Sequence, residues 1–91
     1  MTFKEEMEEE GYISVTQAKN GVWVALMSFM YTYSLCVGLD SSGYKGRYCY
    51  EYFTDAMIAL LRYSGEGDPE GPWIKYKGEG GERLGPGAKG V

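Results

Sequence analysis

Few residues in this sequence have side chains that could do catalytic chemistry. Cys36 and Cys49 are the only two thiols in the 91 residues, and histidine is absent. Without histidine the chain lacks the commonest general base, the commonest proton shuttle and a favoured zinc ligand. A nucleophilic serine or cysteine would then depend on Lys, Asp or Glu as its base, which is uncommon. We therefore expect a protein that is not an enzyme, with no catalytic residues, metal or cofactor.

The two cysteines could form a pair across two strands. A reversal centred between Ser42 and Gly43 sets Cys36 directly opposite Cys49, with Cβ atoms ~4.5–5.5 Å apart, slightly longer than a relaxed disulfide prefers. No Cys-x-x-Cys motif activates either thiol, and two cysteines are too few for the disulfide framework of a small secreted scaffold. We expect two ordinary reduced cysteines in a cytosolic protein.

Carboxylates dominate the N-terminal segment, which carries acid where a secretion signal would carry basic and apolar residues. Five glutamates crowd this segment: Glu5, Glu6, Glu8, Glu9 and Glu10. They could imitate the phosphates of a nucleic acid and occupy a basic groove on another protein. The plain alternative is a solvated helix that keeps a small protein soluble. The whole chain has 13 acidic and 9 basic residues, a net charge of -4, which argues against a large phosphate-neutralising surface.

Aromatic residues offer a second kind of binding surface. The segment 45–52, KGRYCYEY, has a basic residue and a glycine ahead of alternating aromatics, as in RNA-recognition-motif sheets that stack bases on rings. The candidate nucleic-acid platform consists of Arg47, Tyr48, Tyr50 and Tyr52. Arg47 stands where an aromatic is expected, and the tyrosines become core residues if a helix covers them. Further along, Trp73 and Tyr76 are candidate anchors for a protein partner.

These residues must be positioned by a single small domain spanning 1–91, because the length is too short for two. Its composition divides into an acidic segment 1–10, an aromatic body 12–63 and a glycine-rich segment 64–91. Thr2 and Glu5 have the capping-box spacing for a short helix that ends at Gly11. That helix is marginal in isolation, so we expect Phe3 and Met7 to dock it on the body.

The body predicts antiparallel strands. Asn20 and Gly21 indicate a hairpin between a strand at 12–19 and one that begins at Val22, and a second reversal at 40–43 leads into a strand at 44–51. The uncharged stretch 20–39 is long enough for a membrane helix, but its scattered polar residues and central tyrosines favour buried strands.

A helix at 55–63 is predicted next, with Thr54 as its N-cap and Gly65 beyond its end. Its buried stripe of Met57, Leu60 and Leu61 is expected to cover the sheet face that carries Tyr48, Tyr50 and Tyr52, the tyrosine face. A short strand at 73–77 follows. The composition of 78–91 is that of a flexible tail, and the alternative is a tail docked on the body or on a partner. The predicted fold is α+β: a small antiparallel sheet of three to five strands, one main helix on one face, and a short acidic N-terminal helix.

Several of these segments also resemble known proteins. The dipeptide at 43–44, the segment 47–50, the helix at 56–61 and the segment 67–75 resemble short proteins encoded by bacteriophages and prophages, among which anti-CRISPR inhibitors are a prominent class. The resemblance implies a stoichiometric inhibitor of a host nucleic-acid-processing defence complex, such as a CRISPR effector. It would act in the host cytoplasm as a monomer or homodimer and would not bind a membrane. The alternatives are a single-stranded nucleic-acid-binding module and a small phage assembly protein that pairs through a sheet edge.

Overall fold

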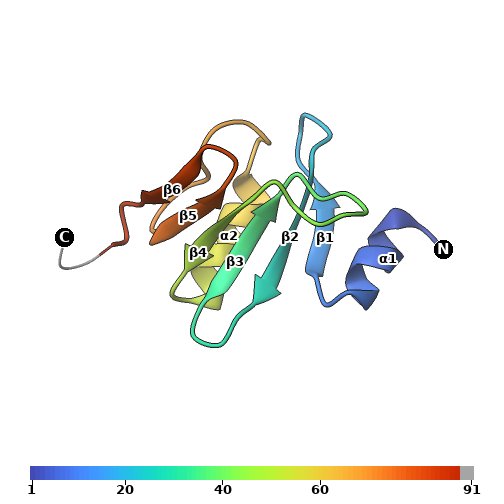
Figure 1. Cartoon of the computed structure of the whole chain (residues 1–91), viewed down its shortest axis with the longest axis horizontal. Coiled ribbons are helices and arrows are strands. Elements are labelled where there is room, and N and C mark those ends of the chain that lie inside the picture. Colours follow the sequence, from blue (N-terminus) through green and yellow to red (C-terminus); the bar gives the residue numbers. More distant parts are fainter. Residues whose placement is uncertain (89–91) are drawn as a thin grey trace.

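The computed structural model describes residues 1–88, which form an antiparallel sheet with its strands in chain order and two helices (Figure 1). The elements are α1 (Phe3–Glu9), β1 (Ile13–Gln17), β2 (Trp23–Ser28), β3 (Tyr33–Val37), β4 (Gly46–Tyr50), α2 (Phe53–Arg62), β5 (Lys75–Gly78) and β6 (Gly81–Leu84). The predicted antiparallel α+β architecture is confirmed. The described residues contain six strands instead of the three to five expected.

One helix packs on each face of the sheet. Helix α2 packs across β2, β3 and β4, and the core formed between this helix and the sheet comprises Val24, Leu26, Leu35, Tyr48, Tyr50, Ala56, Ala59, Leu60 and Trp73. Helix α1 packs on the other face, over a second core of Met7, Tyr12, Val15, Ala25, Cys36 and Leu39. Burial on both faces explains why β2 and β3 carry no charge. No helix among residues 1–88 is long and apolar enough to cross a membrane.

The capping box of α1 forms as its spacing predicts. The Thr2 hydroxyl accepts from the Glu5 N–H at 3.2 Å, and the Glu5 carboxylate accepts from the Thr2 N–H at 3.0 Å. Met7 is only 2% exposed, and the Phe3 ring lies 4.9 Å from the Trp23 ring. The expected docking of this helix is therefore confirmed, and it supplies the stability that an isolated seven-residue helix lacks.

The register of β3 on β4 differs from the prediction by two residues. Cys36 lies opposite Arg47, not Cys49, and Tyr33 lies opposite Tyr50. The reversal is centred one residue earlier because the Asp40 carboxylate accepts from the Ser42 N–H at 2.8 Å, closing a turn between Asp40 and Gly43. A shift of two residues preserves the strand alternation, so the tyrosine face was predicted correctly.

The hairpin at Asn20 and Gly21 is confirmed, although β1 is shorter than the predicted strand 12–19. Helix α2 begins earlier than predicted, with Tyr52 and not Thr54 at the N-cap. Leu61 is exposed instead of buried, because Ala56, Ala59 and Leu60 form the stripe against the sheet. Two small alanines let this helix approach the sheet closely.

The C-terminal segment is docked where its composition predicts flexibility. Strand β5 begins at Lys75, two residues later than the start of the predicted strand 73–77. It pairs with both β4 and β6. Beyond β6, the N–H of Gly85 donates to the Ile74 carbonyl at 2.8 Å, and that of Gly87 donates to the Trp73 carbonyl at 2.9 Å. The remainder of the predicted tail, 89–91, lies outside the described residues.

Replacing Met7 with alanine tests the docking of α1. We expect Met7→Ala to lower the free energy of unfolding by about 2–3 kcal/mol, because it removes the buried contact that holds the helix on the sheet. Urea denaturation measures this loss. The matched control, Lys4→Ala on the exposed side of the same helix, should change it by less than about 0.5 kcal/mol. An equal loss of unfolding free energy in the two variants would contradict the docking of α1 on the sheet.

Candidate binding sites

The predicted acidic residues form one exposed surface. All five glutamates of the N-terminal segment are exposed: Glu5, Glu6, Glu8, Glu9 and Glu10. Among residues 1–88 none of them forms an ion pair with a basic side chain. The Thr2 N–H and then its hydroxyl lower the pKa of Glu5 by hydrogen bonding, so this carboxylate is charged at neutral pH.

A sixth carboxylate joins this surface from the loop between β3 and β4, which extends toward α1 (Figure 1). The pKa of Tyr12 is raised mainly by burial, and the charges of Glu10 and Asp40 both contribute, which places these carboxylates around one ring. Hydrogen bonds from the Ser42 hydroxyl and N–H lower the pKa of Asp40. We call the five glutamates and Asp40 the acidic surface. No group of three or more Cys, Asp or Glu side chains within residues 1–88 is placed to hold a metal ion.

The candidate nucleic-acid platform is not assembled as predicted. Tyr48 and Tyr50 are 4% and 0% exposed beneath α2, so bases cannot stack on them. Tyr52 is exposed, but it lies at the N-cap of α2 and not in the sheet. Arg47 points to the opposite face, where its guanidinium lies 4.4 Å from the centre of the Phe29 ring. Strand alternation separates the arginine from the tyrosines and rules out a shared surface.

The two candidate anchors are also less available than predicted. Trp73 is only 4% exposed and packs edge-on against Tyr48 at 5.0 Å, and Tyr76 is half-buried beside the same ring. The most exposed large apolar side chains near strands are Met30 and Tyr31, each 85% exposed in the turn between β2 and β3. Sequence analysis missed this turn because it interrupts a continuous β-forming stretch.

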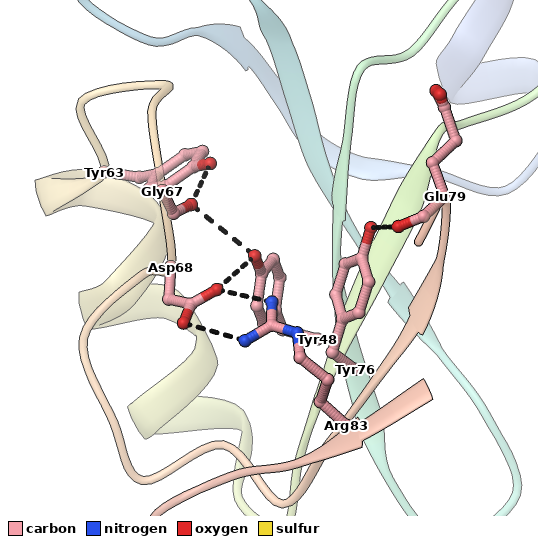
Figure 2. A network of polar contacts seen from close by, with 7 residues as sticks. All are labelled: Tyr48, Tyr63, Gly67, Asp68, Tyr76, Glu79 and Arg83. Atoms are coloured by element: carbon pink, nitrogen blue, oxygen red, sulfur yellow. Dashed lines mark hydrogen bonds and ion pairs between the residues drawn. The ribbon is translucent and has the colours of Figure 1, made fainter. Parts of the chain in front are cut away.

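Asp68 joins distant segments into a polar network on the α2 side of the sheet (Figure 2). Its carboxylate accepts from the Tyr48 hydroxyl at 2.8 Å and from both terminal nitrogens of Arg83 at 2.7 and 3.1 Å. The hydrogen bond from Arg83 is the main cause of its lowered pKa. Burial is the main cause of the raised pKa of Tyr48, and Asp68 adds to it. Arg83 also lies 4.8 Å from the centre of the Tyr76 ring.

Next to this network is a cavity of about 240 Å³ that we call the tyrosine cavity. Its walls are the side chains of Val22, Val37, Lys45, Tyr48, Tyr63 and Tyr76, with three glycines between them. Gly46 is needed here, because a Cβ at this position would lie 2.5 Å from the Tyr76 hydroxyl oxygen. The sequence gives little sign of this cavity, since its residues come from five separate segments.

The cysteines are both free and do not face each other. Cys36 is buried in the core beneath α1, whereas Cys49 lies opposite Ser34, with its sulfur 3.7 Å from the serine hydroxyl. Burial raises the pKa of Cys36 to about 12, which keeps the thiol protonated and unreactive.

No protein-family model, curated protein or solved structure matches this chain. The chemistry of its surfaces therefore carries the functional assignment.

The charge on Asp68 should make stability depend on pH. Its lowered pKa means that the ionised carboxylate stabilises the folded state above its unfolded pKa of about 3.9, and this contribution disappears as pH falls through the folded pKa. We expect Asp68→Asn to cost about 1 kcal/mol at pH 7 and progressively less below pH ~4. Urea denaturation at several pH values measures the difference.

The control for Asp68→Asn is Glu70→Gln, which removes a single, more exposed ion pair to Arg62 at 3.2 Å. This substitution should change stability little at any pH. A cost for Asp68→Asn that stayed constant down to pH 2 would show that its charge is not responsible.

Alkylation kinetics test the burial of Cys36. In a Cys49→Ser variant, iodoacetamide at pH 8 should modify Cys36 only after denaturant is added, because the folded protein keeps this thiol buried and protonated. Mass spectrometry follows the reaction. In the reciprocal Cys36→Ser variant, the half-buried Cys49 should react faster in the folded state. Rapid modification of folded Cys36, at the rate of a peptide thiol, would contradict the structure.

Proposed function

We propose that this chain is a small binding protein whose acidic surface occupies a basic, nucleic-acid-contacting groove of a partner protein. One observation carries the proposal: α1 and its C-cap Glu10 hold five exposed glutamates, none in an ion pair among residues 1–88, on the sheet through buried Met7 and the contact of Phe3 with Trp23. The carboxylates complement lysines and arginines that otherwise bind phosphates.

Docking of α1 is what makes these charges useful for binding. A free seven-residue helix with adjacent like charges would be largely unfolded, and a partner would have to order it. The folded chain has met this entropic cost already, so more of the interaction energy remains for affinity. Attraction between opposite charges also speeds association, and salt weakens it.

The inhibitor class follows from this chemistry together with the resemblance of segments within 43–75 to phage and prophage proteins. A protein that fills a groove made for nucleic acid acts as a stoichiometric inhibitor without catalysis. The proposed target is a host defence complex that processes nucleic acids, such as a CRISPR effector, in the host cytoplasm. The chain would act as a monomer or homodimer.

A second candidate function, assembly of copies through a sheet edge, is favoured by one observation. Strand β6 lies at the free edge of the sheet with all of its residues exposed, Leu84 among them. This edge is only four residues long and carries Glu82 and Arg83, features that oppose pairing between edges. The acidic surface therefore supports the inhibitor more strongly.

Charge reversal tests the proposal. A tagged protein is used to capture partners from a nuclease-treated lysate of a bacterial host. We expect a nucleic-acid-binding protein to be retained at low salt and lost with Glu8→Lys/Glu9→Lys, because two attractive carboxylates become repulsive. The matched control, Glu66→Lys/Glu79→Lys, reverses two exposed glutamates away from α1 and should leave capture unchanged.

Three results would contradict the proposal. The first is equal capture by both double variants, the second is a complex that nuclease destroys, and the third is recovery of self-assembled protein alone. The last would favour assembly through β6, whereas nuclease sensitivity would favour direct nucleic-acid binding.

A further inference from the structure

We propose that two copies of this chain dock face to face, with α1 of each copy on an uncovered, basic half of the other copy's sheet. Two sets of side chains carry the proposal, because they have opposite charges and lie at opposite ends of one sheet face. It goes beyond the inhibitor function and does not depend on it, since the contact joins two copies of the same chain.

Cations lie on the side of the sheet where α1 packs, but at the other end. Strand pairing sets Cys36, a core residue beneath α1, opposite Arg47, and sets Arg47 opposite Lys77, so these side chains share one face. Lys75 joins them by strand alternation. Helix α1 packs at the β1 end and α2 packs on the opposite face, so neither helix covers this side of β4, β5 and β6. We call Arg47, Lys75 and Lys77 the basic face.

The basic face keeps an excess of positive charge after its own ion pairs are counted. Lys75 and Lys77 share one carboxylate, that of Glu82, at 3.3 and 3.2 Å, and their side chains are 40% and 45% exposed. Arg47 lies over the Phe29 ring and forms no ion pair among residues 1–88. One lysine charge and the arginine charge are therefore left for an acidic partner.

The glutamates of α1 are too far away to balance these charges within one chain. Figure 1 shows α1 beside β1 at one end of the molecule and β5 and β6 at the other end. Four strand spacings of ~4.8 Å separate β1 from β5, a distance of roughly 19 Å. No ion pair joins α1 to the basic face in the described residues. The two sets of charges can meet only between molecules.

Shape and symmetry favour a second copy as the occupant. A helix is about 10–12 Å across, so α1 stands above its end of the face and leaves the basic face lower. A two-fold axis parallel to the strands would place α1 of each copy over the lower half of the other. The exposed glutamates of α1 point away from their own sheet and hence toward the second one. Leu84, which lies opposite Lys75 and is 59% exposed, would be covered in this contact.

Such a contact is isologous, because each copy gives the same two surfaces, and it closes at two subunits. Exposed charges dominate it, so association should be weak and should disappear at ~1 M salt, where the Debye length is about 3 Å. The glutamates of α1 cannot contact a second copy and a basic partner at the same time. If the proposed function holds, the dimer would therefore compete with that partner.

Sedimentation velocity of the purified full chain at low salt, over micromolar to millimolar concentrations, tests the proposal. We expect a concentration-dependent shift from monomer to dimer that ~1 M salt reverses. Glu8→Lys/Glu9→Lys and Lys75→Glu/Lys77→Glu should each weaken association at least about 10-fold, because each places like charges against one another. The circular dichroism spectrum of each variant verifies its fold.

The two reversals together should restore the contact. A variant with all four substitutions has the net charge of the wild type, and its basic α1 would face an acidic sheet, so it should dimerise again. An equimolar mixture of the two double variants should form a mixed dimer for the same reason.

The matched control is Glu66→Lys/Glu70→Lys, which reverses two exposed glutamates in the loop after α2. It brings the net charge of -4 to zero, as Glu8→Lys/Glu9→Lys does, but it should leave association unchanged.

A monomer at every concentration would overturn the proposal. A dimer that persists in ~1 M salt and in both double variants would overturn it too and would indicate pairing through the edge of β6. So would a folded four-substitution variant that stays monomeric, or a monomer whose basic face binds a single-stranded oligodeoxynucleotide instead. Lys75→Glu/Lys77→Glu leaves the acidic surface intact and should still capture the basic partner, so failure of the dimer and failure of the inhibitor function can be told apart.

Discussion

The buried hydroxyl of Tyr48 needs a hydrogen-bond acceptor, and the C-terminal half of the structure depends on how this need is met. Its side chain lies in the core, where an unpaired hydroxyl is costly, and Asp68 provides the acceptor at 2.8 Å. Asp68 also binds Arg83 through two hydrogen bonds. The loop after α2 and the hairpin of β5 and β6 are thereby fixed to the central strand β4, and the wall of the tyrosine cavity is fixed with them.

The two helices use the sheet for different purposes. Helix α2 buries the apolar face of the central strands, while α1 adds a second core on the other face and turns its glutamates outward. The glutamates of the acidic surface and the tyrosine cavity consequently lie on opposite sides of the sheet, whereas Asp40 is close enough to Lys45 of the cavity lining for their charges to interact.

Local patterns in the sequence predict much of this fold. The capping box at Thr2 and Glu5, the hairpin at Asn20 and the strand alternation around Tyr48 depend on neighbouring residues, and all three are present. The register of β3 on β4 depends on a hydrogen bond inside a turn, and three of the four residues of β6 are a glycine and two charged residues with little strand propensity. Which sheet face a helix covers, and where a cavity remains, are decided by packing between distant segments. The tyrosine platform therefore could not be settled from sequence, whereas the exposure of the glutamates could.

The central claim is that the acidic surface forms the contact with a partner protein. Hydrogen–deuterium exchange of the protein alone and in its captured complex tests it most directly, because amides buried by a partner exchange more slowly. The account predicts added protection in α1 and in the loop between β3 and β4 around Asp40. Protection confined to β6 or to the turn at Met30 and Tyr31, with α1 unchanged, would contradict it.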